Sequence, residues 1–564
     1  MNQASVAYFT MEMALDSSMS TYAGGLGVLA GDTVRSAAEL KVPMVAITLL
    51  HRKGYFKQRL DASGWQQEEP SDWNIKDYLH LQEARASVSL EGREVIIQAW
   101  MYEVRSPRGF IVPVFFLDTD LPENQPWDRT LTHFLYGGGT PYRLCQEVIL
   151  GIGGIRMLRA LGFTSLSRYH MNEGHAALLG LELLDEVAAR AGRNTFMPQD
   201  LQAVRDQCVF TTHTPIASGH DQFPLDLALR ILGRRELQEM QGVFCCHETL
   251  NMTYLALNLS HYINGVAKKH AETSQLMFGK YEIDSITNGV HAATWTSPPF
   301  QSLFDRLIPG WRADNFSLRF AHSLALDEIK SAHLQAKQLL LNRVLQETNL
   351  ALDPHILTLG FARRATAYKR IDLLVSDVSR LQSIAASVGP LQIIYAGKAH
   401  PNDHQGKEAI QRIIEVQGML HPSFKLVYLP NYDLDLAKLI TAGVDVWINT
   451  PHPPYEASGT SGMKAALNGV PSLSVLDGWW LEGWIEGETG WSIGETCPID
   501  PCQPTRAACD SAALYHKLEK EVIPLFYQNP DRFADVMRHC ISLNGSFFNT
   551  QRMVSQYVIK AYFE

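Results

Sequence analysis

Short apolar runs alternate with amphipathic, helix-like segments along most of this chain. Runs such as HILTLGFARR, LQIIYAGKAH, FKLVYLPNY and VDVWINTP end in polar or glycine residues, and each is followed by helical periodicity. This alternation predicts βα units with parallel sheets, so we expect an α/β fold class. Ligands of such sheets bind beyond the carboxyl ends of the strands, where this chain carries its most unusual polar residues.

The pattern falls into two blocks, because a chain of 564 residues is too long for one hydrophobic core. We expect one α/β domain over 1–300, a connection with a long helix over 301–353, and a second α/β domain over 354–543. A final helix over 544–564 is expected to cross back to the first domain. We also expect a cleft between the two domains.

Composition and charge narrow the class of protein. Apolar residues make up 46% of the chain and charged residues 19%, as in ordinary globular proteins. The formal net charge of -10 disfavours binding to nucleic acid or to anionic membranes. No apolar run is long enough to span a membrane, and the start of the chain, interrupted by Glu12, does not resemble a signal peptide. We therefore expect a cytoplasmic protein.

Cysteine and histidine spacing gives no sign of a metal site. The eight cysteines lack the spacing of zinc ligands, and the spacing between His170 and His175 is not the metalloprotease pattern. We expect reduced thiols and no metal. His170, His175, His213 and His291 nevertheless stand near strand ends, together with Asn and Trp residues, and such a set suits a sugar.

A turn of small residues precedes a helix-like stretch in EASGTSGMKAALNG, where Lys464 stands just behind Ser458–Gly462. A helix N-terminus offers free N–H groups and a partial positive charge, so this turn is a candidate anion site. The stretch is not a Walker A loop. An ordinary helix start with a partly exposed lysine is the alternative.

Two further stretches are candidates. Gly24, Gly25 and Gly27 in TYAGGLGVLAGD let the backbone approach a ligand closely, although a tight turn into a helix explains them equally well. FARRATAYKRIDLL follows an apolar run and carries four cations. These cations can bind an anion, or they can form a solvated basic face of a helix, and both interpretations stay open. The four cations are Arg363, Arg364, Lys369 and Arg370.

These stretches, taken in order, resemble the α-glucan phosphorylase family, which acts on glycogen, starch or maltodextrin. The resemblance is nearly full length and is carried by GGLG, NEGH, THT, TNGVHAATW, RRATAYKR, YAGKAHP, NYDLDLA and EASGTSGMK. The EASGT-x-x-MK motif is highly specific. The stretch NTPHPPY and the pair Trp479–Trp480 are similar to a short bacterial-type form.

The resemblance implies a fold, a reaction and a cofactor. The implied fold has two Rossmann-like domains facing across a cleft, the GT-B glycosyltransferase architecture. The first domain would bind the glucan and the second would carry pyridoxal phosphate. The implied reaction is reversible, retaining phosphorolysis of α-1,4-glucan by inorganic phosphate, which releases α-D-glucose 1-phosphate. Family habit also suggests a homodimer, with no nucleic-acid or membrane partner.

The same resemblance assigns roles to individual residues. Lys464 would bind pyridoxal phosphate as a Schiff base, and the cofactor's 5'-phosphate would relay a proton. The implied catalytic residues are Lys464, Arg364, Lys369 and His213. The implied cofactor-binding residues are Lys464, Gly459, Thr460, Ser461, Tyr432 and Arg363. The implied substrate-binding residues are Gly25, Leu26, Gly27, His175, Asn288, Tyr368, Glu456, Ser458 and Gly459.

The chain departs from the family pattern at two positions, and other functions stay open. Gly139 and Asp433 stand where the long enzymes carry an acidic and a basic residue, respectively. A nucleotide-sugar-dependent glucan synthase of the same fold is one alternative. Lys464 argues against it, because retaining members commonly carry a second glutamate at that position. A non-catalytic glucan-binding relative and, with less support, an NAD-dependent oxidoreductase are the others.

Overall fold

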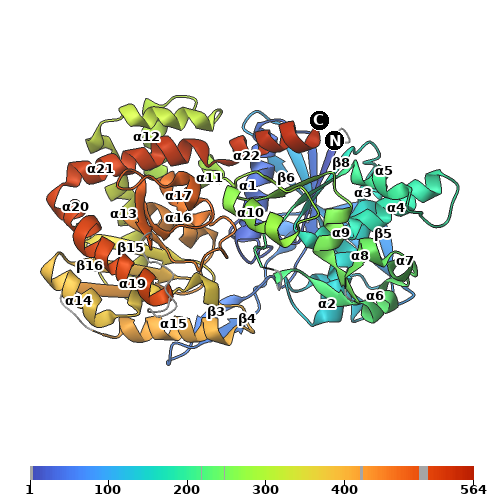
Figure 1. The fold of residues 1–564 in the computed structure, drawn as a ribbon, viewed down its shortest axis with the longest axis horizontal. Helices are drawn as coiled ribbons and strands as arrows, with labels where there is room; N and C mark the ends of the chain where they lie inside the picture. The colour runs from blue at the N-terminus through green and yellow to red at the C-terminus, as the bar shows by residue number, and fades with distance from the viewer. Residues whose placement is uncertain (1–3, 217–218, 247, 420–422, 495–505, 564) are drawn as a thin grey trace. The chain divides into compact units, whose positions relative to one another are not determined.

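The computed structural model divides into two compact units, which we describe separately (Figure 1). It describes residues 4–216, 219–246, 248–419, 423–494 and 506–563. Unit 1 comprises Met1–Phe56, Pro70–Thr287 and Met553–Glu564, and unit 2 comprises Lys57–Glu69 and Asn288–Arg552.

The limits of the units differ from the expected domains at three places. The main part of unit 1 ends at Thr287 rather than at 300, and the stretch 301–353 belongs to unit 2. The reason is that helix α13 (Leu326–Thr348) buries Leu340 and Val344 in the core of unit 2. The segment 57–69 also belongs to unit 2, which the sequence pattern did not indicate.

Unit 1 is built on a nine-stranded sheet. Its inner strands, such as β1 (Val6–Thr10) and β2 (Met44–Leu49), are buried along their whole length, since helices cover both faces. In spatial order the sheet is β14 (Asp284–Ser285), β13 (Tyr262–Gly265), β9 (Cys208–Thr211), β8 (Arg168–Asn172), β1, β2, β7 (Ile111–Asp118), β6 (Arg93–Arg105) and β5 (His80–Leu90). Strands β5, β6 and β7 pair antiparallel, and the other pairs are parallel.

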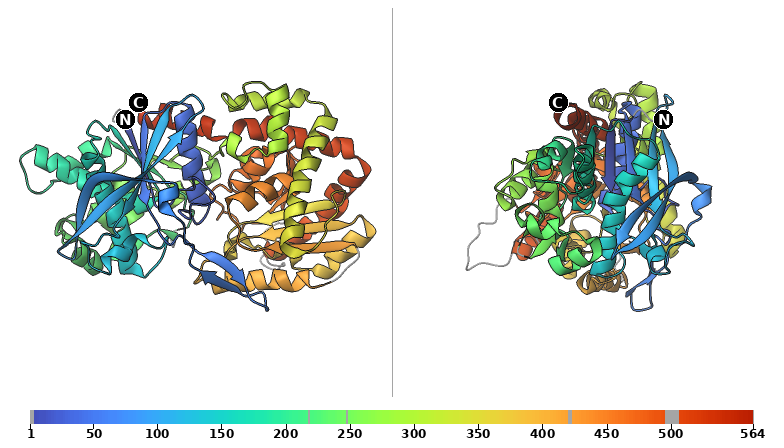
Figure 2. Two further views of the ribbon diagram at one scale, coloured as in Figure 1. Left: turned by 180° about the vertical axis from the view of Figure 1, so that it is seen from behind. Right: turned by 90° about the vertical axis from the view of Figure 1, so that its right-hand side faces the viewer.

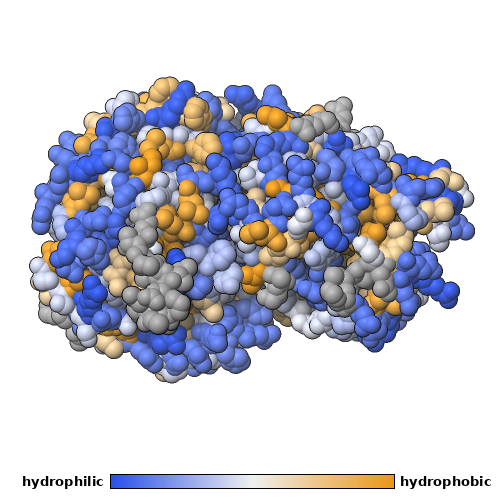
Figure 3. All heavy atoms as spheres, in the orientation of Figure 1, coloured by the Kyte–Doolittle hydropathy of each residue, from blue (hydrophilic) through white to orange (hydrophobic). Residues whose placement is uncertain are grey.

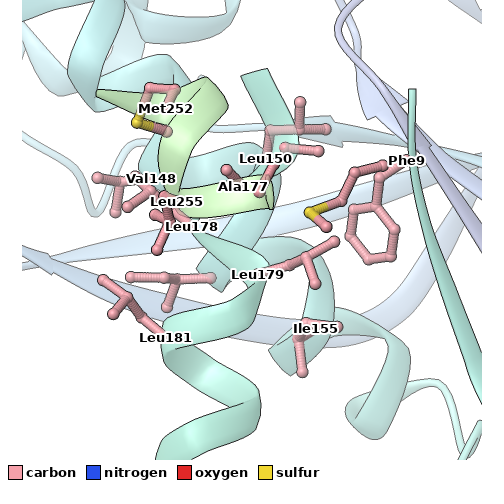
Figure 4. Close-up of a cluster of buried hydrophobic side chains, with 14 of the residues drawn as sticks. Phe9, Val148, Leu150, Ile155, Ala177, Leu178, Leu179, Leu181, Met252 and Leu255 are labelled. Atoms are coloured by element: carbon pink, nitrogen blue, oxygen red, sulfur yellow. The ribbon is translucent and has the colours of Figure 1, made fainter. Parts of the chain in front are cut away.

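Apolar side chains from these strands and their helices form the core of unit 1. Figure 4 shows part of it, with Ile155 of α3 and Leu179 of α4 gathered near Phe9 of β1. The helices of this unit are α1 (Gly25–Glu39), α2 (Thr140–Val148), α3 (Gly154–Ala160), α4 (Leu179–Arg190), α5 (Asp200–Arg205), α6 (Leu225–Leu232), α7 (Glu236–Glu239), α8 (Gln241–Phe244), α9 (Met252–Asn258) and α10 (Lys268–Met277). A small sheet joins β10 (Gln222–Pro224), β12 (Thr249–Asn251) and β11 (Cys245–Cys246).

The end of the chain returns to unit 1. Helix α22 (Thr550–Tyr557) begins in unit 2, and its later residues Met553, Val554 and Tyr557 are buried in a second apolar cluster of unit 1. The hydroxyl group of Tyr562 and Nδ1 of His170 form a hydrogen bond of 2.6 Å. The last residues are therefore part of the first core.

Unit 2 is built on a six-stranded parallel sheet. Its strands in spatial order are β17 (Phe424–Leu429), β16 (Leu391–Ala396), β15 (Leu357–Ala362), β18 (Val446–Asn449), β19 (Ser472–Val475) and β20 (Gly490–Ile493). Its helices are α11 (Ala292–Trp295), α12 (Pro298–Leu307), α13, α14 (Val378–Ser387), α15 (His404–Gln417), α16 (Leu434–Gly443), α17 (Ser461–Ala466), α18 (Trp480–Gly483), α19 (Arg506–Lys517), α20 (Ile523–Gln528) and α21 (Pro530–His539). A hairpin of β3 (Lys57–Leu60) and β4 (Gln66–Glu69) completes the unit.

A buried ion network joins α13 to the amino ends of strands β15 and β18. Asp445, which is 2% exposed, accepts hydrogen bonds from His333 Nε2 at 2.8 Å and from Lys337 Nζ at 2.6 Å. The backbone N–H of Thr358 donates to the same carboxylate at 2.7 Å. This end of the sheet is opposite to the carboxyl ends, where a ligand is expected, so the network serves stability.

Asp445→Ala is expected to destabilise unit 2 by about 3–5 kcal/mol, since it leaves the Lys337 ammonium buried without its counter-ion. The matched control is Asp435→Ala, which removes an exposed ion pair to Lys438 and should cost less than about 1 kcal/mol. Urea unfolding followed by tryptophan fluorescence measures both. Equal effects of the two substitutions would contradict the role of the network.

The surface and the cysteines complete the description. On the face in Figure 3, hydrophilic side chains dominate and hydrophobic ones form small separate patches. Within the described ranges, no helix is long and apolar enough to cross a membrane, and no group of three or more His, Cys, Asp or Glu side chains could hold a metal ion. Cys145, Cys208 and Cys540 are free, but Cys509 is disulfide-bonded, so the expectation of reduced thiols is wrong there. Cys497 and Cys502 lie outside the described residues.

Candidate active site

The strand order creates one switch point in each sheet, between β15 and β18 in unit 2 and between β1 and β8 in unit 1. The chain runs outward from β15 or β1 to one edge and then returns to the other side of that strand. Ligands of doubly wound sheets bind at this point, beyond the carboxyl ends of the strands. Most residues predicted from the sequence follow one of these four strands.

In unit 2 a buried carboxylate holds two cations. Arg363 directly follows β15, Lys369 ends a short turn (Ala367–Lys369), and Glu456 lies in the loop after β18. Lys369 Nζ donates to both oxygens of Glu456 at 2.8 and 2.7 Å, and Arg363 Nη2 donates to Oε2 at 2.7 Å. Burial alone raises the pKa of Glu456, but the charges of Arg363 and Lys369 and their hydrogen bonds lower it to about 2. Glu456 is therefore ionised at neutral pH.

Arg363 and one buried hydroxyl keep hydrogen-bonding capacity for a ligand. Arg363 is 9% exposed, and its Nε and Nη1 have no hydrogen-bond partner among the described residues. Ser458 is 4% exposed, and its Oγ atom also has no hydrogen-bond partner among the described residues. Buried donors are rarely left unsatisfied, because each costs about 1–3 kcal/mol. These groups therefore indicate that an anion or a hydroxyl-rich molecule completes the site.

Lys464 lies on α17, buried against an aromatic ring. The residue is 6% exposed, and its Nζ stands 3.8 Å from the centroid of the Trp295 ring. Asn468 fixes this pair, because its Nδ2 donates to the carbonyls of Trp295 at 2.8 Å and of Lys464 at 3.0 Å. Gly462 has no room for a side chain, since a Cβ there would lie 2.8 Å from the Trp479 ring. The structure thus encloses the Lys464 amine rather than exposing it.

A second carboxylate supports the loop that carries Glu456. Asp477 Oδ2 accepts a hydrogen bond from the backbone N–H of Glu456 at 2.9 Å, and Oδ1 accepts from the N–H of Gly478 at 2.9 Å. Burial raises the pKa of Asp477 to about 6, and the charge of Glu456 adds to this, although the two N–H groups act in the opposite direction. Sequence reasoning missed Asp477.

Asp477 is expected to leave a signature in the pH dependence of stability. Its pKa is raised in the folded state, so between about pH 4 and 6 the folded protein keeps a proton that the unfolded chain has lost. Stability conferred by this group is lost as the pH rises through that window. In Asp477→Asn this loss is absent. From pH 4 to 6 the free energy of unfolding of the variant should therefore fall less, or rise more, than that of the unmodified protein. Urea titrations at several pH values measure it, and identical pH slopes in both proteins would contradict it.

Other residues predicted for this site have mixed positions. Arg364 is exposed, whereas Arg363 is buried. The charge of Arg364 acts on His400, whose pKa is lowered first by burial. Burial also raises the pKa of Tyr432, which lies near Arg363. Gly459 has a φ of +86°, which favours glycine. Thr460 precedes α17 as its N-cap residue, and Ser461 is the first residue of that helix. The centroid of the Tyr368 ring lies 4.5 Å from Lys369 Nζ. The Oδ1 atom of buried Asn288 has no hydrogen-bond partner within the described part of the chain.

In unit 1 the glycine loop is held by a carboxylate. Glu12 Oε2 accepts hydrogen bonds from the N–H groups of Ala23 at 2.6 Å and Gly24 at 3.1 Å, and Tyr136 OH donates to Oε1 at 2.8 Å. A Cβ at Gly27 would lie 2.7 Å from Glu12 Oε2, so this position requires glycine. The loop caps α1, whose first-turn N–H groups, those of Gly25, Leu26 and Gly27, have no partner within the helix.

His213 is held by Asn172, the last residue of β8, and by Glu173, which follows it. Asn172 Oδ1 accepts from His213 Nε2 at 2.7 Å, and Glu173 Oε2 accepts from the His213 backbone N–H at 2.8 Å and from Thr214 Oγ1 at 2.9 Å. Burial lowers the pKa of His213 to about 4, so the ring is neutral at pH 7. Glu173 has φ 78° and ψ 164°, a region nearly restricted to glycine, and strain of this kind concentrates at functional sites.

His175 belongs to a neighbouring charged cluster. Its Nε2 lies 3.3 Å from Asp221 Oδ2, and Arg143 Nη2 donates to the same oxygen at 2.8 Å. Burial lowers the pKa of His175, and the charge of Arg143 contributes. Gly139 precedes α2, which carries Arg143, and is exposed. A basic and an acidic group thus stand beside His175, although Gly139 itself has no charge.

Sequence reasoning missed four residues that organise these sites. Glu173 lies inside the NEGH motif, yet only His175 was selected from it. Glu12 was taken as evidence against a signal peptide, although a carboxylate within an apolar run is itself a sign of function. Asp477 and Asn468 had no signal beyond their place near the EASGTSGMK and LNG motifs. Gly25, Leu26, Gly27, His175 and His213 belong to unit 1, and the other predicted residues belong to unit 2.

Comparison with known proteins shows the class to which this fold and site belong. A family model described as carbohydrate phosphorylase matches residues 234–490. Maltodextrin phosphorylase of Thermococcus litoralis is 37% identical over 99% of this chain and 70% of its own length. Glycogen phosphorylase of Mycobacterium tuberculosis is 35% identical over 98% of this chain and 70% of its own length. Glycogen phosphorylase of Aquifex aeolicus is 31% identical over 99% of this chain and 86% of its own length.

The chain belongs to the carbohydrate phosphorylase family. This family membership confirms the resemblance drawn from the motifs.

Proposed function

We propose that the protein catalyses the reversible, retaining phosphorolysis of α-1,4-glucan by inorganic phosphate and releases α-D-glucose 1-phosphate. The names of the relatives support glycogen or maltodextrin as the glucan. The observation that carries the proposal is the buried Glu456 carboxylate between Arg363 and Lys369, in the same unit as the enclosed Lys464 amine. This set provides cations for phosphate and an acceptor for sugar hydroxyls.

The residues of unit 2 fit pyridoxal phosphate, the cofactor of this family. Lys464 would hold it covalently through its enclosed amine, and Trp295 offers an aromatic face beside that amine. Arg363 has two N–H donors to spare for a phosphate, and Gly459, Thr460 and Ser461 lead into α17 without bulky side chains. Tyr432 would lie near the ring. When bound, the cofactor supplies a phosphate whose second pKa near 6 suits proton transfer at neutral pH.

The chain's own residues would divide the remaining work. Lys369 and Arg364 would bind the substrate phosphate, and Tyr368 would stand near it. Glu456 is ionised and can accept hydrogen bonds from glucose hydroxyls, while Ser458 Oγ can donate or accept one. Asn288 and Gly459 would contact the same sugar. Two adjacent phosphates repel each other, so a site that contains both requires these cations.

Unit 1 would supply the rest of the substrate contacts. The first-turn N–H groups at Gly25, Leu26 and Gly27 suit a phosphate oxygen. His213 is neutral at pH 7, so it adds no positive charge near the sugar, and its main-chain carbonyl would face the developing oxocarbenium ion. His175 would bind a glucan hydroxyl. The finer architecture, two Rossmann-like domains facing across a cleft in the GT-B manner, is part of this proposal, as are a homodimer and a cytoplasmic location.

The alternative of a nucleotide-sugar-dependent synthase is tested in the synthetic direction. Purified protein with pyridoxal phosphate is given a maltodextrin primer and either glucose 1-phosphate or a nucleotide glucose. Phosphate release and chain elongation with glucose 1-phosphate alone support the proposal. Elongation only with the nucleotide sugar would replace it by the synthase, and glucan binding without elongation from either donor would indicate a non-catalytic relative.

Arg364→Ala is expected to weaken the apparent affinity for phosphate by about 10- to 150-fold, because it removes a charge-assisted contact worth about 1.5–3 kcal/mol. The KM for maltodextrin should change little. The control is Arg412→Ala, which removes an exposed ion pair to Asp372. Initial rates at varied phosphate measure the effect. The same KM for phosphate in Arg364→Ala and in the unmodified protein would remove Arg364 from the phosphate site.

A further inference from the structure

The hairpin β3–β4 comes from the first part of the chain but packs within unit 2, beside helix α15 (Figure 2). Most of its side chains are polar, and two glutamines, Gln58 and Gln66, are only 3% and 1% exposed. An uncharged amide is costly to bury unless both its donor and its acceptor are satisfied. The contacts of these two side chains therefore show what the hairpin holds.

The Gln66 side chain bonds both the N–H and the carbonyl of one residue in the loop after β16, as the backbone of a paired strand does. Its Nε2 donates to the carbonyl of Ala399 at 2.9 Å, and its Oε1 accepts from the N–H of Ala399 at 2.9 Å. Nε2 also donates to Glu68 Oε1 at 2.7 Å, and Lys407 Nζ of α15 lies 2.7 Å from that carboxylate oxygen. The hairpin is thus anchored to both the loop and the following helix.

Gln58 joins this loop to the one after β17. Its Nε2 donates to the carbonyl of Gly397 at 3.0 Å and to Gln66 Oε1 at 2.9 Å. Its Oε1 accepts from the N–H of Asn431 at 2.8 Å, and Asn431 Oδ1 accepts from the N–H of Gln58 at 3.2 Å. One pair of amide side chains therefore fixes two loops at the carboxyl edge of the sheet.

These two loops lie beside residues predicted for the site, because the charge of Arg364 acts on His400 and the charge of Arg363 acts on Tyr432. The loop after β16 contains Lys398 and His400, and the loop after β17 contains Tyr432. The carbonyl of Lys398 accepts from the N–H of Ala365 at 2.9 Å, so the loop runs alongside the segment with the site arginines. Burial lowers the pKa of Lys398 to about 8.

We propose that Gln58 and Gln66 are positioning residues that hold the loops after β16 and β17 in the geometry required for phosphate use. The inference rests on the proposed function, and it adds a specific role for the N-terminal hairpin. The glutamines do not touch the phosphate. They set the places of Lys398, His400 and Tyr432, whose backbone neighbours they bind.

The test compares Gln66→Leu and Gln58→Leu with Gln67→Leu, a substitution of the exposed glutamine next to Gln66 on the same strand. We expect the KM for phosphate to rise at least about tenfold, or about 1.4 kcal/mol, in the first two variants, because the two loops lose the hydrogen bonds that hold them in place. The KM for maltodextrin should stay within about twofold in all three. Calorimetric titration of inorganic phosphate into the holoenzyme should show the same ratio of Kd values.

Gln66→Asn serves as the second variant if the leucine variants do not fold. It keeps an uncharged amide on a side chain that is one methylene shorter, so its hydrogen bonds to Ala399 are weakened rather than lost, and the phosphate Kd should be intermediate. Unchanged phosphate Kd values, or equal changes in the KM of phosphate and of maltodextrin, would overturn the inference. If the unmodified protein binds phosphate but releases no glucose 1-phosphate, the proposed function fails, and the Kd values still decide the inference.

Discussion

Replacement of Lys464 by alanine is expected to abolish phosphate-dependent release of glucose 1-phosphate, with a loss of at least about 10³-fold, or about 4 kcal/mol of activation free energy. The physical reason is that the enclosed Lys464 amine is the group that would bind pyridoxal phosphate covalently. Without this bond the cofactor would leave. The absorbance of the bound cofactor and the rate of glucose 1-phosphate release, measured on the same preparation, check the prediction.

Lys464→Arg separates the covalent role from a structural one. Arginine keeps a positive charge beside the Trp295 ring but cannot replace the lysine amine in a bond to the cofactor. We expect this variant to fold and to bind no cofactor. Lys438→Ala, at a partly exposed lysine of α16, is the matched control and should keep full activity. Cofactor binding and turnover in Lys464→Arg would show that the cofactor is held elsewhere.

Replacement of Glu456 by glutamine is the second large expected effect. It removes the only carboxylate to which both Arg363 and Lys369 donate within the described residues. Removing one partner from a buried charge pair costs about 3–5 kcal/mol, so we expect a clear fall in stability together with a fall in kcat/KM of about 10²-fold or more.

A double-mutant cycle with Lys369→Met shows whether the charges interact as the structure indicates. The double variant lacks one cation as well as the carboxylate, so it should be more stable than Glu456→Gln alone. Urea unfolding in the absence of the cofactor measures the stability of all four proteins. Strictly additive effects on the free energy of unfolding would contradict the interaction between Lys369 and Glu456.

The alternation of apolar runs was enough to predict an α/β protein, because buried parallel strands read as continuous apolar segments. The runs ILTLGFA and VDVWIN correspond to β15 and β18, and the polar residues that follow them, Arg363 and Glu456, do meet in the structure. Arg363 and Glu456 meet because the carboxyl ends of parallel strands share one edge of the sheet. This holds whatever the distance along the chain between the two strands.

Features that depend on contacts between distant segments could not be predicted. Nothing in residues 57–69 indicates that this hairpin packs in unit 2, because its partners, such as Ala399 and Asn431, lie more than three hundred positions away. A motif also cannot tell which of two adjacent arginines is buried. Both arginines follow β15, and the structure buries Arg363 while it exposes Arg364.

The central claim is that inorganic phosphate is the nucleophile that cleaves the glucan. Phosphorus NMR of purified protein with pyridoxal phosphate, maltodextrin and inorganic phosphate tests it most directly. The account predicts that the phosphate signal declines while a signal of α-glucose 1-phosphate grows, and that no sugar is released when phosphate is omitted. Release of free glucose or maltose without phosphate, or no new phosphorus signal from cofactor-loaded protein, would contradict it.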